Sequence, residues 1–256
     1  MRIIRVEHGG TSYYGILEDG LVFRLHQQPG HMEPIPLSEA KVLPLVTPSK
    51  VVCVGLNYKA HAEELGYPLP NMPSFFLKPP SSIIGNGEPI VLPSGMGRIE
   101  HEAELAMVVG KVCRNLTPEE AEESLFGFTC ANDVTAREVQ KVDPLIGYCK
   151  SYDTFCPIGP WIETELEDIN DLSIRCLVNG EVRQSANTGD MIFRPLDLLC
   201  FLSRVMTLMP GDVILTGTPP GISPIQADDV VQVSIEGIGT LSNPVEGPGP
   251  EEKILQ

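Results

Sequence analysis

The chain has 256 residues, of which 42% are hydrophobic and 20% are charged, so it can bury a sizeable core. Its 34 acidic residues outnumber 18 basic ones, and the resulting net charge of −16 argues against nucleic acid or an anionic membrane as a partner. No apolar run is long enough to span a bilayer, and the seven cysteines contain no C-x-x-C pair. We therefore expect a cytoplasmic protein whose cysteines are reduced and mostly buried.

Residues 1–45 are predicted to form a small N-terminal β domain, followed by a larger domain over residues 46–256. Turn signals at Gly9-Gly10 and Glu18-Asp19-Gly20 separate short apolar stretches. Strands are expected at 3–6, 13–17 and 21–25. This segment carries no group of residues whose spacing suggests catalysis.

A buried strand is predicted at 51–55, and a short helix over 58–65, capped by Asn57, follows it. Within this helix His61 and Glu64 are three residues apart, so they share one face and can form a hydrogen bond. A carboxylate that orients an imidazole makes a general base, but an ordinary surface ion pair has the same spacing. The proline-rich stretch 67–73 has the composition of a hinged lid.

Residues 100–109 are predicted to form one strand whose first half is acidic and whose second half is apolar. Because side chains alternate along a strand, Glu100, Glu102 and Glu104 project to one face. Three neighbouring carboxylates repel one another unless water, protonation, basic partners or a divalent cation relieves the repulsion. A solvated edge strand is the simpler alternative, and a metal site requires further ligands elsewhere.

A third ligand is predicted further along the chain. Thr117-Pro118 begins a helix that should end near Gly127, and the next strand, 128–134, places Asp133 among small and apolar residues. An acid in such surroundings is rarely unpaired, so Asp133 is the best candidate. Lys150, which lies near aromatic residues, can offset negative charge on a bound anion.

The C-terminal third is predicted to contain a hairpin around Asn179-Gly180 and an amphipathic helix over 196–208 that Pro195 opens. A strand at 213–216 leads to Gly217-Thr218-Pro219, which can present a hydroxyl and backbone N–H groups to a carboxylate. A purely structural turn has the same sequence character, so this stretch alone does not establish a binding role.

Six motifs, in this order, together resemble the fumarylacetoacetate hydrolase family. They are Gly55-Leu56-Asn57-Tyr58 with His61, Ala62 and Glu64; Phe75-Phe76-Leu77-Lys78-Pro79; His101-Glu102 with Glu104; Asp133-Val134-Thr135-Ala136-Arg137 with Gln140; Lys150-Ser151-Tyr152-Asp153-Thr154-Phe155; and Gly217-Thr218-Pro219. The resemblance runs from about residue 50 to the C-terminus and implies a β-rich α+β fold with a β-sandwich roll. One departure is Ile222-Ser223, where relatives usually carry Val-Gly.

The resemblance also assigns roles to nine residues. It implies that Glu102, Glu104 and Asp133 hold Mg²⁺ or Mn²⁺. His61, Glu64 and Lys150 are the implied catalytic residues, with His61 and Glu64 as a dyad on a mobile lid. Arg137, Gln140 and Thr218 are the implied substrate-binding residues.

The expected reaction is hydrolysis of a C–C bond in an acylpyruvate-type 2-oxo acid, through an enolate that the metal and Lys150 stabilise. His61, assisted by Glu64, would deliver the water. Decarboxylation of oxaloacetate and isomerisation of 2-hydroxymuconate-type diacids pass through the same enolate, so both remain open. We expect a homodimer that acts on a small 2-oxo acid or 2-hydroxydienoate. A metal-dependent binding protein without turnover is the alternative from another class, although binding alone needs no base.

Overall fold

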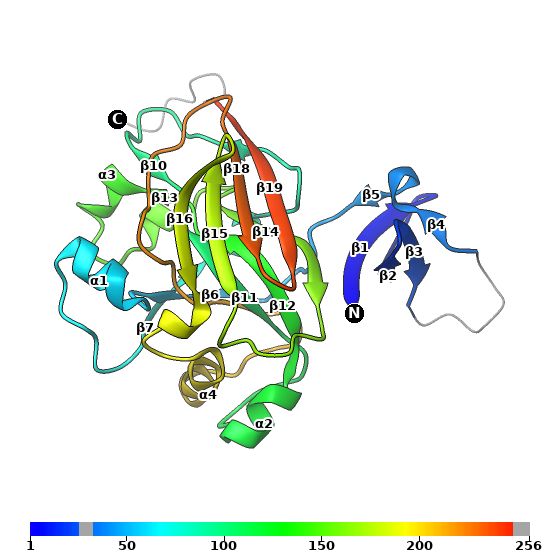
Figure 1. Cartoon of the computed structure of the whole chain (residues 1–256), viewed down its shortest axis with the longest axis horizontal. Helices are drawn as coiled ribbons and strands as arrows, with labels where there is room; N and C mark the ends of the chain where they lie inside the picture. Colours follow the sequence, from blue (N-terminus) through cyan, green and yellow to red (C-terminus); the bar gives the residue numbers. More distant parts are fainter. Residues whose placement is uncertain (26–32, 248–256) are drawn as a thin grey trace.

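The computed structural model describes residues 1–25 and 33–247, and this part of the chain has a β-rich mixed fold. Its helices are short and lie at the edges of the sheets (Figure 1). They are α1 (Lys59–Leu65), α2 (Pro118–Glu123), α3 (Arg137–Gln140) and α4 (Pro195–Val205). None of the helices in the described residues is long and apolar enough to cross a membrane.

Two large sheets carry most of the structure, and a two-stranded sheet lies beside them. The first sheet runs in the order β4 (Ile35–Pro36), β3 (Leu21–Arg24), β2 (Thr11–Glu18), β1 (Arg2–His8), β14 (Cys156–Glu163), β12 (Leu125–Asn132), β11 (Ala103–Val109), β17 (Val213–Leu215), β6 (Val51–Gly55) and β7 (Ser74–Lys78), with β5 (Lys41–Val42) paired to β1 and β8 (Ile83–Ile84) to β14. The second contains β16 (Glu181–Asn187), β15 (Ser173–Val178), β18 (Val230–Ile235), β19 (Gly239–Glu246) and β9 (Ile90–Val91). The small sheet pairs β10 (Ile99–Glu100) with β13 (Thr135–Ala136).

The N-terminal strands lie to one side of the molecule in Figure 1, and the three predicted strands correspond to β1, β2 and β3. They are nevertheless continuous with the first sheet. Strand β1 pairs antiparallel with β14, with Arg2 opposite Glu163 and Ile3 opposite Ile162. The division of the chain at residue 45 stays a prediction.

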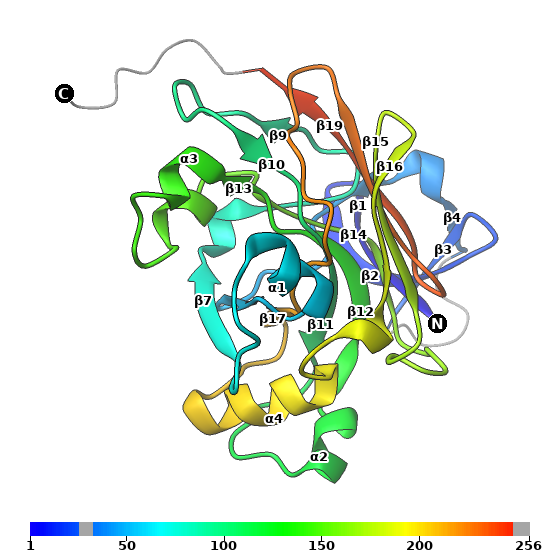
Figure 2. The same ribbon diagram turned by 60° about the vertical axis from the view of Figure 1, so that its left-hand side comes forward.

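Strand β11 is buried along its whole length, and its side chains alternate between two cores. Leu105 and Met107 belong to the core that the second sheet covers, whereas Ala106 and Val108 belong to the core shared with the N-terminal strands. The predicted alternation of faces is therefore confirmed for this strand. Figure 2 shows β11 behind α1, with the second sheet to its right.

The prediction of one unbroken strand over 100–109 is wrong, because the chain leaves the strand conformation at His101 and Glu102. Glu100 pairs with Thr135 in the small sheet, whereas Ala103 pairs with Asn132 in the large one. The change of partner separates Glu100 from the other two glutamates.

The prediction that Asn57 caps the first helix is also wrong. Tyr58 is the N-cap of α1, without a side-chain capping bond. The fully buried amide of Asn57 instead donates to the carbonyls of Phe193 and Thr216 and accepts from the Phe193 backbone N–H. It therefore joins distant loops, which a local capping signal cannot reveal.

Three predicted boundaries were too late in the sequence. Thr117 forms the expected capping box with Glu120, but α2 ends at Glu123, because the chain then pairs with β11. Strand β12 ends at Asn132, so Asp133 directly follows it. Helix α4 begins at Pro195 as predicted and ends at Val205, before Leu208 forms a bridge to Cys113.

The cysteines follow the expectation. All seven are free and buried. Burial raises the pKa of the Cys130 and Cys176 thiols to about 12, so these side chains stay protonated and act as small apolar groups.

Candidate active site

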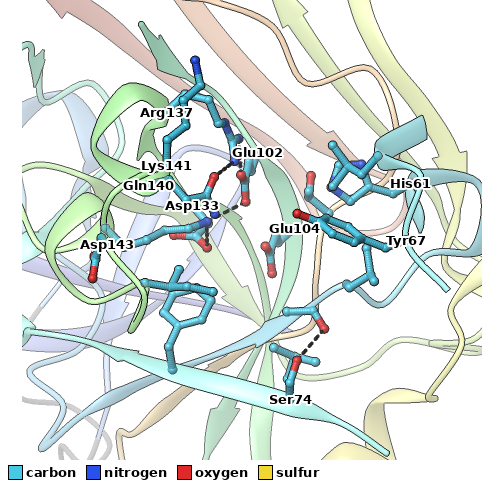
Figure 3. Close-up of a pocket in the computed structure, with 18 of the residues that line it drawn as sticks. His61, Tyr67, Ser74, Glu102, Glu104, Asp133, Arg137, Gln140, Lys141 and Asp143 are labelled. Carbon is cyan, nitrogen blue, oxygen red and sulfur yellow. Dashed lines mark hydrogen bonds and ion pairs between the residues drawn. The ribbon is translucent and has the colours of Figure 1, made fainter. Parts of the chain in front are cut away.

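Three buried carboxylates meet at one end of the β11–β12 pair. Glu102 precedes β11, Glu104 lies on it, and Asp133 follows β12. One oxygen from each lies within 4.8 Å of the others. The antiparallel register explains their meeting, because Ala103 pairs with Asn132 and the Asp133 N–H donates to the Glu102 carbonyl at 2.9 Å. The structure thus brings together the three residues that the sequence suggested as metal ligands (Figure 3).

Two lysines bind this cluster directly. The Lys150 ammonium donates to Glu102 Oε2 at 2.8 Å and to Asp133 Oδ2 at 2.6 Å. The Lys78 ammonium donates to Asp133 Oδ1 at 2.5 Å and to the Phe155 carbonyl at 2.7 Å. Burial disfavours the charged form of Lys150, but Asp133 and Glu102 outweigh it and raise the pKa of Lys150, so the ammonium stays charged.

Lys78 was not assigned a role from the sequence, although it is only 1% exposed. A signal was present, because Phe76 and Lys78 occupy alternate positions of one strand and therefore point to the same face. A lysine on a buried face requires an acidic partner.

The pKa values of the two glutamates in the cluster are shifted in opposite directions. Burial opposes ionisation of Glu102, but Lys150 and Arg137 outweigh it and hold the pKa of Glu102 well below its usual range. Burial raises the pKa of Glu104 well above its usual range, and the charges of Asp133 and Glu102 raise it further. The Gly217 N–H donates to Glu104 Oε2 at 2.5 Å, which fixes the carboxylate in place.

The cluster fits a hard divalent cation. Glutamate and aspartate oxygens are the ligands that Mg²⁺ and Mn²⁺ prefer, and all three residues are buried. Lys78 and Lys150 bind Asp133 and Glu102, whereas the hydrogen bond to the Glu104 carboxylate comes from the neutral Gly217 N–H, which does not neutralise its negative charge. A cation would offset that charge.

Arg137 connects the cluster to Glu100. Its Nε donates to Glu100 Oε2 at 2.6 Å and an Nη to Glu102 Oε1 at 2.5 Å, while the other Nη donates to Gln140 Oε1 at 2.6 Å. Glu100 is 1% exposed and also pairs with Arg98, so the arginines satisfy its charge. The guanidinium of Arg137, expected to contact substrate, is thus bound by three protein side chains.

His61 and Glu64 form the expected pair on α1. The distance from His61 Nδ1 to Glu64 Oε2 is 2.8 Å, and Glu64 Oε1 accepts from the Gly221 N–H at 3.0 Å. A carboxylate only accepts, so Nδ1 carries the proton and Nε2 is the basic nitrogen. His61 is 6% exposed, unlike a residue of an ordinary surface pair.

One cavity of about 570 Å³ connects these groups. Glu64 does not line it, but the other eight predicted site residues do: His61, Glu102, Glu104, Asp133, Arg137, Gln140, Lys150 and Thr218. Figure 3 shows His61 and Tyr67 on one side of Glu104, and Arg137, Gln140 and Lys141 on the other. The cavity therefore places a candidate base opposite a basic wall.

Thr218 lines the cavity, but its hydroxyl already has two protein partners. It donates to the Ala103 carbonyl at 2.9 Å and accepts from Gln184 Nε2 at 2.8 Å. In the predicted lid segment 67–73, Tyr67, which lines the cavity, and also Leu69 and Met72 are more than half exposed. The lid function of this segment stays a prediction.

Comparison with known proteins places this site in a class of enzymes. The model of the family described as "Fumarylacetoacetate (FAA) hydrolase C-terminal" matches residues 50–246, and that of the family described as "Rv2993c-like, N-terminal" matches residues 1–44. The chain belongs to the fumarylacetoacetate hydrolase family. It is an enzyme of that family with a buried acidic triad suited to a metal.

Particular relatives narrow the comparison. The crystal structure of 5-carboxymethyl-2-hydroxymuconate delta-isomerase from Mycobacterium smegmatis is 42% identical, with a TM-score of 0.90 over 98% of this chain and 100% of that one. Human mitochondrial oxaloacetate tautomerase FAHD2A is 42% identical over 225 residues, which are 82% of this chain and 71% of the relative. Maleylpyruvate hydrolase from Sphingobium sp. SYK-6, crystallised with manganese(II) and pyruvate, is 30% identical, with a TM-score of 0.82 over 97% of this chain and 100% of that one.

Proposed function

We propose that this protein catalyses proton transfer on a small 2-oxo acid, either as a keto–enol tautomerase or as an isomerase of a 2-hydroxymuconate-type diacid. One observation carries this proposal. His61, which Glu64 orients, lines the same cavity as the three carboxylates. The names of the two relatives at 42% identity support it. Hydrolysis, the reaction expected first from the sequence, becomes the second candidate.

The proposal includes a cation, Mg²⁺ or Mn²⁺, held by Glu102, Glu104 and Asp133. The buried oxygens and the manganese of the maleylpyruvate hydrolase structure support this assignment. When bound, such an ion supplies Lewis-acid polarisation of a carbonyl oxygen. The chemistry assigned to the protein itself lies in the residues around the ion.

His61 Nε2 is the group to take or return the proton at the carbon next to the keto group. Glu64 keeps the proton on Nδ1 and stabilises the imidazolium that forms when Nε2 becomes protonated. Gly221 in turn fixes Glu64, so the imidazole keeps one orientation. A single base that removes a proton from one position and returns it to another suffices for tautomerisation and isomerisation.

Lys150 supplies a fixed positive charge. Its ammonium lies in the cavity wall and stays charged, so it lowers the free energy of negative charge that develops on the substrate oxygen. Gln140 and Thr218 line the cavity and are proposed to contact the substrate. Arg137 acts through Glu102 and Gln140, which it holds in place, in addition to any substrate contact.

Hydrolysis of an acylpyruvate remains a specific second candidate, because the dyad that moves a proton can also activate water. The maleylpyruvate hydrolase, at 30% identity, supports it. Decarboxylation of oxaloacetate needs no activated water and depends on Lys150 and the cation more than on His61.

A substrate panel separates these reactions. Wild type and His61→Ala are assayed with Mg²⁺ on enol-oxaloacetate, a 2-hydroxymuconate-type diacid, acetylpyruvate and fumarylpyruvate. We expect loss of the enol or diene absorbance without release of pyruvate, and a large decrease in His61→Ala. Rapid release of pyruvate from an acylpyruvate would replace the isomerase with the hydrolase, and release of carbon dioxide from oxaloacetate would favour the decarboxylase.

A homodimer is also proposed, because the broad β surface and the family resemblance both favour one. Light scattering at micromolar concentration tests it. A mass near twice 27.9 kDa is expected, and a mass near 27.9 kDa would contradict it.

A further inference from the structure

Gln184 lies on β16, in the second sheet, and is not one of the residues that line the cavity. It is nevertheless fully buried and binds two segments next to the site. Its Oε1 lies 3.0 Å from His101 Nδ1 and accepts from the Ala103 N–H at 3.0 Å. Its Nε2 donates to Thr218 Oγ1 at 2.8 Å and to the Pro219 carbonyl at 2.7 Å.

These four partners use the full hydrogen-bonding capacity of the amide. They also fix its orientation, because the Ala103 N–H can only donate and the Pro219 carbonyl can only accept. His101 Nδ1 must therefore donate to Oε1. This leaves His101 Nε2 to accept from the Ser223 hydroxyl at 2.8 Å. Ser223, which is half-buried, stands at the sequence position noted above as a departure from the family pattern and extends this network toward the surface.

The partners of Gln184 lie next to groups of the active site. His101 and Ala103 flank Glu102 in the chain, so Gln184 Oε1 binds the imidazole on one side of this carboxylate and the backbone N–H on the other. Thr218 directly follows Gly217, whose N–H binds Glu104. One side chain thus binds both the segment that carries Glu102 and the loop that faces it, in addition to the direct bond from Thr218 to Ala103.

The β15–β16 hairpin, which carries Gln184, also supports the His61–Glu64 pair. Gly221 packs directly on it, since a Cβ at Gly221 would lie 2.2 Å from the Arg183 carbonyl oxygen and 3.4 Å from Gln184 Cα. The N–H of Gly221 binds Glu64. The loop from Thr218 to Gly221 therefore takes its position from β16 at both of its ends.

We propose that Gln184 is a positioning residue for the cation site and for the Thr218 loop, although it touches neither cation nor substrate. This inference rests on the proposed cation site but not on the proposed reaction. Oε1 holds the segment around Glu102, which sets cation affinity. Nε2 holds the Thr218 loop, which sets the capture of a chelating acid.

Two substitutions separate the proposed role of Gln184 Oε1 from that of Nε2. Gln184→Glu keeps an oxygen for His101 and Ala103 but places a second oxygen against the Pro219 carbonyl. Gln184→Met has a similar length and removes all four bonds. Cation affinity is measured by titration calorimetry with Mn²⁺ alone, and ligand capture by titrating oxalate, which chelates like a 2-oxo acid, into the Mn²⁺-loaded protein.

We expect Gln184→Met to weaken Mn²⁺ binding about tenfold, the lower end for losing a residue that orients a ligand. Gln184→Glu should restore Mn²⁺ affinity to within about threefold of wild type while oxalate binding stays about tenfold weaker. Gln232→Met, at a half-buried glutamine on β18 of the same sheet and away from the cavity lining, is the control and should change neither affinity.

Wild-type Mn²⁺ affinity in a folded Gln184→Met protein would overturn the inference. Equal loss of Mn²⁺ affinity in both variants would also overturn it, because a merely structural role predicts no rescue. If Gln184→Met does not fold, unchanged oxalate affinity in Gln184→Glu is the overturning result. Neither titration needs turnover, so a wild type that binds Mn²⁺ and oxalate but converts no substrate refutes the proposed reaction alone.

Discussion

The carboxylate cluster and helix α1 border the same cavity but are built in different ways. Glu104 and Asp133 are each 1% exposed and are held by backbone and lysine donors from segments far apart in the chain. Helix α1 has seven residues, of which only His61 and Ala62 are buried. The comparison indicates that the proposed cation site is built onto the end of the β11–β12 pair, whereas the proposed base is carried by an element with little packing of its own. Substitutions in the two regions should therefore separate binding from turnover.

The largest effect is expected in the cluster. Glu104→Gln and Asp133→Asn replace a carboxylate by a weaker neutral ligand, so Mn²⁺ affinity should fall by more than about a hundredfold and turnover should become undetectable. Calorimetry with Mn²⁺ measures the first, and the substrate panel the second. Glu63→Gln, an exposed carboxylate on α1, is the control. Full activity of wild type in excess chelator would contradict the metal assignment.

The next effect is expected on α1. His61→Ala and Glu64→Gln should lower kcat/KM by about a hundredfold, the usual scale for loss of a general base. The Mn²⁺ dissociation constant should not change, because neither side chain is among the three clustered carboxylates. If either variant lost cation affinity, the two regions would not be separable in the way proposed.

A smaller loss of activity is expected from Gly221, which connects the loop beside the cluster to Glu64 on α1. Gly221 has φ +97°, and an added Cβ would collide with the Arg183 carbonyl, so Gly221→Ala must move the loop. The bond from its N–H to Glu64 should weaken, and kcat should fall by about tenfold, less than on removing the base itself. Mn²⁺ affinity should stay unchanged. Gly147→Ala, where an added Cβ meets nothing within 4 Å, is the matched control; an equal loss there would contradict the argument.

The smallest effect on cation binding is expected from a substitution of Asp212, which should change only the stability of the fold. Buried Asp212 accepts from Lys50 Nζ, the Ser49 hydroxyl and the Met209 N–H. Burial opposes its ionisation, but these bonds outweigh it and hold the pKa of Asp212 below 3.8. The charged form therefore stabilises the fold above pH 3.8, and this contribution is lost as the pH falls through the lower folded pKa.

Asp212→Asn should accordingly lower the free energy of unfolding by about 1.5–3 kcal/mol at pH 7, with a smaller difference in acid. Urea unfolding at several pH values measures this difference, and Mn²⁺ affinity should equal that of wild type. A difference that grows as the pH falls would have the wrong sign.

Local patterns were enough to predict part of this site. Strand alternation predicted that Glu102 and Glu104 share a face, and an acid among apolar residues singled out Asp133. The helical spacing of His61 and Glu64 predicted that they can form a hydrogen bond, and the family resemblance implied the dyad. Each of these signals lies within a few residues, where strand or helix geometry determines which side chains are neighbours.

The parts of the site that the sequence did not predict depend on contacts between segments far apart in the chain. Lys78 is 55 positions from Asp133, and Gln184 is 81 positions from Ala103, so no periodicity connects them. Glu100 was grouped with the wrong carboxylates for the same reason, since the strand break depends on pairing with Thr135. The sequence correctly indicated that the Asn57 side chain binds backbone groups, but it indicated the wrong ones. Its partners lie beyond position 190 and not in the adjacent helix.

Exchange of the C3 protons of oxaloacetate in D₂O, followed by NMR with Mg²⁺, tests most directly whether the cluster and the base act together in proton transfer. We expect wild type to accelerate deuterium incorporation above the enzyme-free rate. His61→Ala should lose most of this acceleration while still binding Mn²⁺, and Glu104→Gln should lose both. Exchange by His61→Ala at the wild-type rate, or by wild type in excess chelator, would contradict the proposed division between a cation site in the sheet and a base on α1.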